Sequence, residues 1–218
     1  MYKPQKFALL SPETRFDKEI ESLIEFFKMG LSTFHLRKPK FSKEETMDYL
    51  LKIPEEYHNR IVLHDHHKLR EQFKIGGVHF NMRNRLGDSG LFEGMSNSQS
   101  IHSVEELYLI HEHLDYVFIS PVWDSTSKTD YVSSFKDKKS LQMQLHFWKE
   151  SDNRKTELYA LGGVNGKNIE MAQELGFDGT VCLGHVWEPI FGGSLIEGQK
   201  RLHDILEKCH VPGNTVSV

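Results

Sequence analysis

Short apolar runs typical of buried strands alternate along this chain with longer segments whose apolar residues recur at helical spacing. The first strand is expected at residues 6–11, and the helix after it places Ile20, Leu23 and Phe27 on one face before it ends at Gly30. Seven further strands are expected at residues 33–37, 60–65, 78–81, 94–100, 115–120, 156–161 and 179–183. Strands that alternate with helices in this way are typical of α/β proteins with a parallel sheet.

Helix signals fall in the intervals between these strands. Ser42 followed by Glu45, and Ser103 followed by Glu106, match a capping box, so helices should begin at both places, the second spanning 104–113. Other helices are expected at residues 68–74, 139–149, 167–175 and 197–208, whereas 83–92 lacks a clear helical pattern. Eight strand–helix units in a chain of this length favour a single closed (β/α)8 TIM barrel over an open sheet.

Composition narrows the class of protein. The 218 residues, 38% of them hydrophobic, suit one domain over residues 1–218 with a loose tail from about residue 210. A net charge of −4 leaves no broad basic surface, so we expect no nucleic-acid partner. No apolar run is long enough for a membrane helix, and the first residues lack the apolar core of a signal peptide, so we expect no membrane association. Cys182 and Cys209 form neither a disulfide framework nor a metal pair, which fits a cytoplasmic protein.

Polar residues are concentrated where the strands end. In a closed parallel barrel these ends share one rim, which carries the functional groups. The rim residues expected here are His35, Arg37, His64, Asp65, His79, Ser100, His102 and those of segments 81–84, 120–128, 162–165 and 184–185, with Asn84 among them. Glycines after the strands at 156–161 and 179–183 would let backbone N–H groups approach a phosphate, although tight turns alone would also explain them.

The segment after the strand at 115–120 is the most suggestive part of this rim. It places three hydroxyls, from Ser125, Thr126 and Ser127, beside the ammonium group of Lys128. A phosphate or diphosphate needs a donor for each oxygen and a counterion for its charge, and this segment offers both. A polar surface loop is the alternative interpretation.

Several motifs, in this order and spacing, resemble one family from the first strand to the last. They are His-Leu-Arg (35–37), Leu-His-Asp (63–65), Gly-Val-His (77–79), Ser-Ile-His-Ser-Val-Glu-Glu (100–106), Asp-Tyr-Val (115–117), Ser-Pro-Val-Trp-Asp-Ser-Thr-Ser-Lys (120–128) and Ala-Leu-Gly-Gly-Val (160–164). The chain resembles thiamine phosphate synthases and their relatives, the thiazole tautomerases of the TenI type. The segment ending in Lys128 and the Gly-Gly-Val turn are the most specific pieces.

The resemblance implies a transferase of thiamine biosynthesis. Such an enzyme couples hydroxymethylpyrimidine diphosphate to thiazole phosphate and releases diphosphate with the help of Mg²⁺. The partners would be small-molecule phosphates, and a homo-oligomer is left open. The resemblance assigns these roles: catalytic cations, Arg37 and Lys128; metal ligands, Asp65 and Asn84; diphosphate contacts, Ser100, Ser125 and Ser127; thiazole-phosphate contacts, Gly163, Gly184 and His185.

The chain departs from the family pattern at five positions. His35 replaces a glutamine and His64 an asparagine, and both are kept as substrate-binding candidates; Gly184 replaces a serine. Pro39 replaces a lysine, although the flanking Lys38 and Lys40 could reach the same anion. Asn84 replaces a carboxylate, which keeps an oxygen but loses a charge, so affinity for Mg²⁺ should weaken.

Alternative functions stay open. A TenI-like tautomerase would need a histidine for proton transfer where this chain has Pro121, so His35, His64, His102 or His185 would have to substitute. A non-catalytic barrel that binds a thiamine-precursor phosphate would explain the departures. A different phosphate-binding barrel enzyme is disfavoured because no lysine lies inside a strand. A transition-metal site at residues 64–67 is disfavoured because alternate strand residues face opposite ways.

Overall fold

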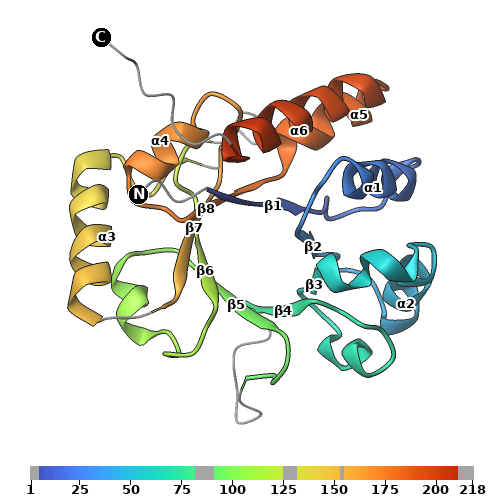
Figure 1. Cartoon of the computed structure of the whole chain (residues 1–218), viewed down its shortest axis with the longest axis horizontal. Coiled ribbons are helices and arrows are strands. Elements are labelled where there is room, and N and C mark those ends of the chain that lie inside the picture. Colours follow the sequence, from blue (N-terminus) through green and yellow to red (C-terminus); the bar gives the residue numbers. More distant parts are fainter. Residues whose placement is uncertain (1–4, 82–90, 125–131, 153–154, 211–218) are drawn as a thin grey trace.

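Eight parallel strands close into one barrel in sequence order, and β1 pairs with β8. The computed structural model describes residues 5–81, 91–124, 132–152 and 155–210. The strands are β1 (Lys6–Leu10), β2 (Phe34–Leu36), β3 (Ile61–Leu63), β4 (Gly77–Phe80), β5 (Ser96–Ile101), β6 (Tyr116–Ile119), β7 (Glu157–Leu161) and β8 (Gly179–Cys182). Figure 1 shows the strands at the centre and the helices around them. The expected (β/α)8 barrel is confirmed, and every expected strand is present.

Helices cover the outside of the barrel. They are α1 (Glu19–Lys28), α2 (Lys43–Leu51), α3 (Lys138–Asp152), α4 (Ile169–Glu174), α5 (Gly184–Phe191) and α6 (Leu195–His210), with 3-10 helices η1 (Glu55–Arg60), η2 (His67–Glu71) and η3 (Glu105–Leu109). The capping box of α2 is confirmed, since the hydroxyl of Ser42 accepts from the Glu45 N–H and the Glu45 carboxylate accepts from the Ser42 N–H. Neither η1 nor α5 was expected from the residue pattern.

The expected helix at 104–113 is wrong in type and length. The chain forms the short η3 instead, Ser103 does not cap it, and only the Glu106 half of the expected box exists, accepting from the N–H groups of His102 and Ser103. Val104, Leu107 and Ile110 are the buried residues of this stretch. Their spacing of three matches a 3-10 helix, which has three residues per turn. The segment at 68–74 likewise forms the 3-10 helix η2.

The main apolar clusters lie between the barrel and its helices. One packs β1, β2 and β3 against α1, α5 and α6 around Trp187, and the other packs β5, β6 and β7 against α3. Leu141, Leu145 and Trp148 are fully buried there, as their spacing predicts. Among the described residues, no helix is long and apolar enough to cross a membrane.

Candidate active site

The inside of the barrel differs from its outer core because one half is polar. Apolar and aromatic side chains of β1, β6, β7 and β8 fill the other half. Across from them, His35, His64, His79 and Ser98 point inward and are almost fully buried. Such a set of polar side chains at the centre of a barrel must satisfy its own hydrogen bonds, because water does not reach it.

The three histidines form one cluster, in which His35 and His64 share a hydrogen bond and His79 contacts both through its ring. Nδ1 of His35 lies 3.0 Å from Nε2 of His64, and Nε2 of His35 lies 2.9 Å from the phenol oxygen of Tyr116. His79 bonds the hydroxyl of Ser98 through Nδ1, at 2.8 Å, and that of Ser100 through Nε2, at 2.7 Å. The cluster therefore runs from Tyr116, low in the barrel, up to His64 and Ser100 at the rim.

Burial keeps these imidazoles neutral. It lowers the pKa of His35 to about 3, and it lowers the pKa values of His64 and His79 well below the usual range, with the neighbouring histidines adding to the effect. A charged imidazolium would lose its hydration and face two other rings at short range, which explains the direction.

Neutral imidazoles are also metal ligands, so the cluster has to be tested as a metal site. One nitrogen from each of His35, His64 and His79 lies within 4.8 Å of the others. However, the rings of His64 and His79 stack with centroids 4.1 Å apart and planes at 21°, so their in-plane lone pairs run side by side and do not converge on one point. The nitrogens of His35 and His79 are also hydrogen-bonded. This geometry fits a hydrogen-bonded cluster, and we assign no metal to it.

The His64–His67 motif does not converge on one point either. Nε2 of His66 bonds the carbonyl of Phe41 at 2.8 Å, and His67 packs its ring against Phe80. His64 points into the barrel and is buried, whereas Asp65 is half-buried. The expectation that His64 and Asp65 face opposite ways stays a prediction.

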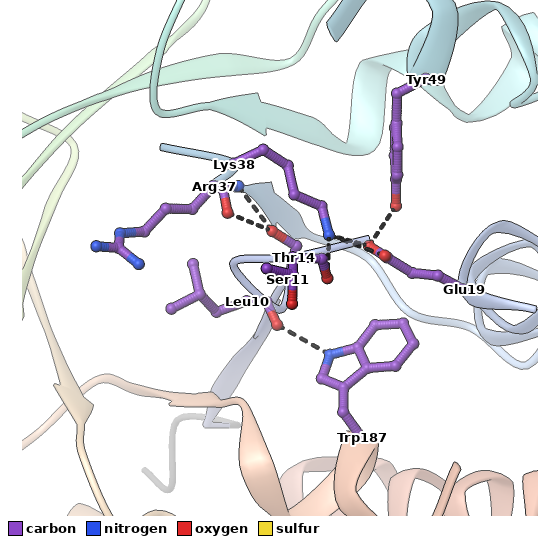
Figure 2. A network of polar contacts seen from close by, with 8 residues as sticks. All are labelled: Leu10, Ser11, Thr14, Glu19, Arg37, Lys38, Tyr49 and Trp187. Atoms are coloured by element: carbon purple, nitrogen blue, oxygen red, sulfur yellow. Dashed lines mark hydrogen bonds and ion pairs between the residues drawn. The ribbon is translucent and has the colours of Figure 1, made fainter. Parts of the chain in front are cut away.

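Arg37 directly follows β2 at the rim. The hydroxyl of Ser11 accepts from the Arg37 N–H at 2.8 Å and donates to the Arg37 carbonyl at 3.0 Å, so the end of β1 fixes the backbone of this residue (Figure 2). The guanidinium group forms an ion pair with Glu13, with Nη1 and Oε1 2.8 Å apart. Arg37 thus presents a cation at the rim from a rigid backbone.

Lys38 does not share this position. Figure 2 shows that its side chain leaves β2 on the opposite side from Arg37. Its ammonium group is buried, lies 2.7 Å from the carboxylate of Glu19 and donates to the carbonyl of Thr14, while the Tyr49 hydroxyl donates to Glu19 at 2.9 Å. Burial lowers the pKa of Lys38 and raises that of Glu19, and the attraction between them opposes both shifts. The expectation that Lys38 reaches a bound anion is therefore wrong; Lys40 is exposed and stays a candidate.

Asp65 and Ser100 belong to the same rim, with β4 between the strands that carry them. Asp65 follows β3 by two residues, and Ser100 is near the end of β5 with its hydroxyl on His79. A single carboxylate fits Mg²⁺, which commonly keeps one or two carboxylates together with waters and phosphate oxygens. Asn84, the other expected metal ligand, lies outside the described residues, as do Ser125, Ser127 and Lys128. Their roles stay predictions.

The opposite part of the rim, above β7 and β8, holds the glycine turns. Gly162 and Gly163 have positive φ angles of 94° and 65°. A Cβ on Gly163 would lie 2.4 Å from the Asp124 carbonyl, so this glycine is required by the close approach of the segment after β6. The backbone alone therefore requires a glycine at this position, and the phosphate role stays a prediction.

The N-terminus of α5 lies beside these turns. Gly184 is its first residue, so the unpaired N–H groups of its first turn are at the carboxyl end of β8. His185 is half-buried, and burial together with Arg201 lowers its pKa. Both residues lie in the first turn of this helix, and their contact with a thiazole phosphate stays a prediction.

The sequence missed four residues that shape this region: Ser11, Glu13, Ser98 and Tyr116. Ser98 and Ser100 alternate along β5, and Tyr116 alternates with Phe118 along β6, so an inward-facing polar pattern was detectable. What the pattern could not show is that these side chains meet histidines from β2 and β4.

The closed barrel, with its polar groups gathered at the carboxyl ends of the strands, places this protein among the (β/α)8 barrels that carry their site on that rim. Comparison with known proteins is more specific. The family model described as "Thiamine monophosphate synthase" matches residues 8–186, and the chain belongs to that family.

Individual relatives agree with this assignment. A thiamine-phosphate synthase of Lysinibacillus sphaericus is 29% identical over 125 residues, which cover 48% of this chain and 54% of the relative, so the match spans about half of that protein. The crystal structure of a thiamine phosphate pyrophosphorylase from Bacteroides thetaiotaomicron superimposes with a TM-score of 0.80 at 28% identity, covering 96% of this chain and all of the other. A thiamine phosphate pyrophosphorylase from Pyrococcus furiosus, with 16% identity and a TM-score of 0.67, supports the fold.

Proposed function

We propose that this protein joins hydroxymethylpyrimidine diphosphate to thiazole phosphate and releases diphosphate. The observation that carries the proposal is the position of Arg37, a half-buried cation fixed by Ser11 at the end of β2, within a chain whose residues 8–186 match the family. Ser100, near the end of β5, and Asp65, two residues after β3, follow the same barrel's strands, and in this proposal they complete the anion site with Arg37.

In the proposed reaction, the bond between the pyrimidine methylene carbon and the diphosphate oxygen breaks, and the thiazole nitrogen forms the new bond to that carbon. The diphosphate departs with the electron pair of the broken bond. Negative charge therefore grows on the leaving oxygens, and stabilising it is the main catalytic task. Arg37 and Lys128 would supply that stabilisation, with hydroxyl donors from Ser100, Ser125 and Ser127.

Asp65, with Asn84, would hold Mg²⁺, which when bound supplies further positive charge to the diphosphate. At the other side of the rim, backbone N–H groups near Gly163 and at the start of α5 would hold the thiazole phosphate, with His185 beside them. His35 and His64 would lie beneath the bound substrates, at the positions where the family has a glutamine and an asparagine. They are buried and hydrogen-bonded to each other, so they would offer neutral groups at the bottom of the site.

The direct test is formation of thiamine phosphate from the two purified precursors and magnesium. The expected product, with release of one diphosphate per coupling, supports the proposal. Absence of product, with thiazole phosphate still bound in calorimetry, would favour a barrel that binds a precursor phosphate without turnover. The same reaction with Arg37→Gln is the control, because product formed equally by this variant would not depend on the proposed site.

One observation favours the tautomerase as the second candidate. His102 has an exposed imidazole whose Nδ1 bonds the carbonyl of Ser120 at 2.9 Å, so it lies at the mouth of β6 next to Pro121, the place where those relatives carry a histidine. A thiazole tautomerisation assay on the wild type and on His102→Gln tests it. If the wild type isomerises the thiazole, His102→Gln does not, and neither forms thiamine phosphate, the tautomerase replaces the synthase as the proposed function.

A further inference from the structure

The guanidinium group of Arg37 is already paired, and its partner is a carboxylate from the loop between β1 and α1. Glu13 Oε1 lies 2.8 Å from Arg37 Nη1, and the two side chains are 46% and 30% exposed. We propose that an oxyanion of the ligand replaces Glu13 on Arg37, so that Glu13 sets the affinity of this part of the rim for anions. The inference rests on the proposed function, in which Arg37 binds the diphosphate.

The loop that carries Glu13 is braced on both sides of this pair. Ser11 holds the Arg37 backbone through two hydrogen bonds. Thr14, the residue after Glu13, accepts from the buried ammonium of Lys38 through its carbonyl, and Lys38 also pairs with Glu19 at the start of α1 (Figure 2). Glu13 therefore faces Arg37 from a fixed backbone, and its side chain is exposed enough to rotate away from the guanidinium group.

Charge decides which ligand can make this exchange. A partly exposed pair between one carboxylate and one guanidinium is weak because water screens it. A diphosphate carries more negative charge and more acceptor oxygens than a carboxylate, and a guanidinium can bind two of those oxygens at once. The diphosphate displaces Glu13, whereas a ligand with a single carboxylate gains nothing over the contact it removes. As diphosphate departs, Glu13 returns to Arg37.

Glu13→Gln removes the competitor and leaves the loop intact. Titration calorimetry of the full chain with inorganic pyrophosphate, at low ionic strength and fixed magnesium, should show affinity about two- to fivefold higher than wild type. Asp17→Asn is the matched control, because it removes one negative charge from the same loop at an exposed position. It should bind pyrophosphate as wild type does.

Three results would overturn the exchange. They are unchanged or weaker pyrophosphate binding by Glu13→Gln, an equal gain in Asp17→Asn, or a gain from Glu13→Gln that persists in an Arg37→Gln background. Arg37→Gln alone separates this inference from the proposed function. If it loses affinity while Glu13→Gln gains none, only the exchange fails; if it binds pyrophosphate as wild type does, the assignment of Arg37 fails as well.

Discussion

Replacing His35 by glutamine should change how the stability of the protein depends on pH. The imidazole is fully buried between His64 and Tyr116, and burial lowers its pKa to about 3. In the unfolded chain its pKa returns to about 6.5. Below that value the unfolded state binds a proton that the folded state does not, so stability present at neutral pH is lost as the pH falls.

The size of the effect follows from the two pKa values. Each pH unit below 6.5 lowers the free energy of unfolding by about 1.4 kcal/mol per buried neutral histidine. Through His35, the wild type should therefore lose about 1.4 kcal/mol by pH 5.5 and about 2.7 kcal/mol by pH 4.5. His35→Gln has lost hydrogen bonds of the imidazole and should be less stable at pH 7.5, but its loss between pH 7.5 and 4.5 should be smaller by these amounts.

Urea unfolding at pH 7.5, 5.5 and 4.5, followed by the fluorescence of buried Trp148 and Trp187, measures the difference. His146→Gln, a change at an exposed position on α3, is the matched control and should follow the wild type. Parallel pH profiles for the wild type and His35→Gln would refute the reasoning, because they would mean that His35 is protonated equally in both states.

Other predictions concern the ion pair and the rim. Lys38→Met should destabilise the fold by about 3–5 kcal/mol because Glu19 is left charged and buried, and adding Glu19→Leu should recover much of this loss in urea unfolding. Gly163→Ala should lower the free energy of unfolding by about 1–3 kcal/mol, since its φ is positive and a Cβ would meet a facing carbonyl; equal midpoints would contradict this. Lys128→Ala should lose most coupling activity while its circular dichroism is unchanged, and full activity would remove it from the mechanism. Asp65→Ala should abolish the response of turnover to magnesium, and a wild-type titration curve would exclude it as a ligand.

The barrel could be predicted from the sequence because each strand carries a local signal. An apolar run bounded by glycine, proline or a capping residue marks a buried strand wherever it occurs, and eight of them in a short chain leave few arrangements. The capping box at Ser42 is local in the same sense. Apolar runs and capping residues can be recognised without knowing which other segments pack against them.

The site was less predictable because its contacts are not local. Lys38 and Arg37 are adjacent cations in the sequence, yet one is buried on Glu19 and the other faces Glu13, and only the packing of the loop after β1 separates them. His35 has the strand position of a ligand contact, but its partners are His64, directly after β3, and Tyr116 of β6. The helix α5 carries Pro189 and ends at two glycines, features that normally break helices.

The pairing of β1 with β8, which closes the barrel, constrains the order in which the chain can fold. Trp187 donates from α5 to the carbonyl of Leu10 at 2.9 Å, and β1 has β8 as one of its two neighbours. A nascent chain therefore exposes an unpaired edge of β1 until β8 and α5 have been synthesised, and the contact between Leu10 and Trp187 joins residues 177 positions apart. Folding should be slow and completed late, and truncations before β8 should aggregate through that open edge.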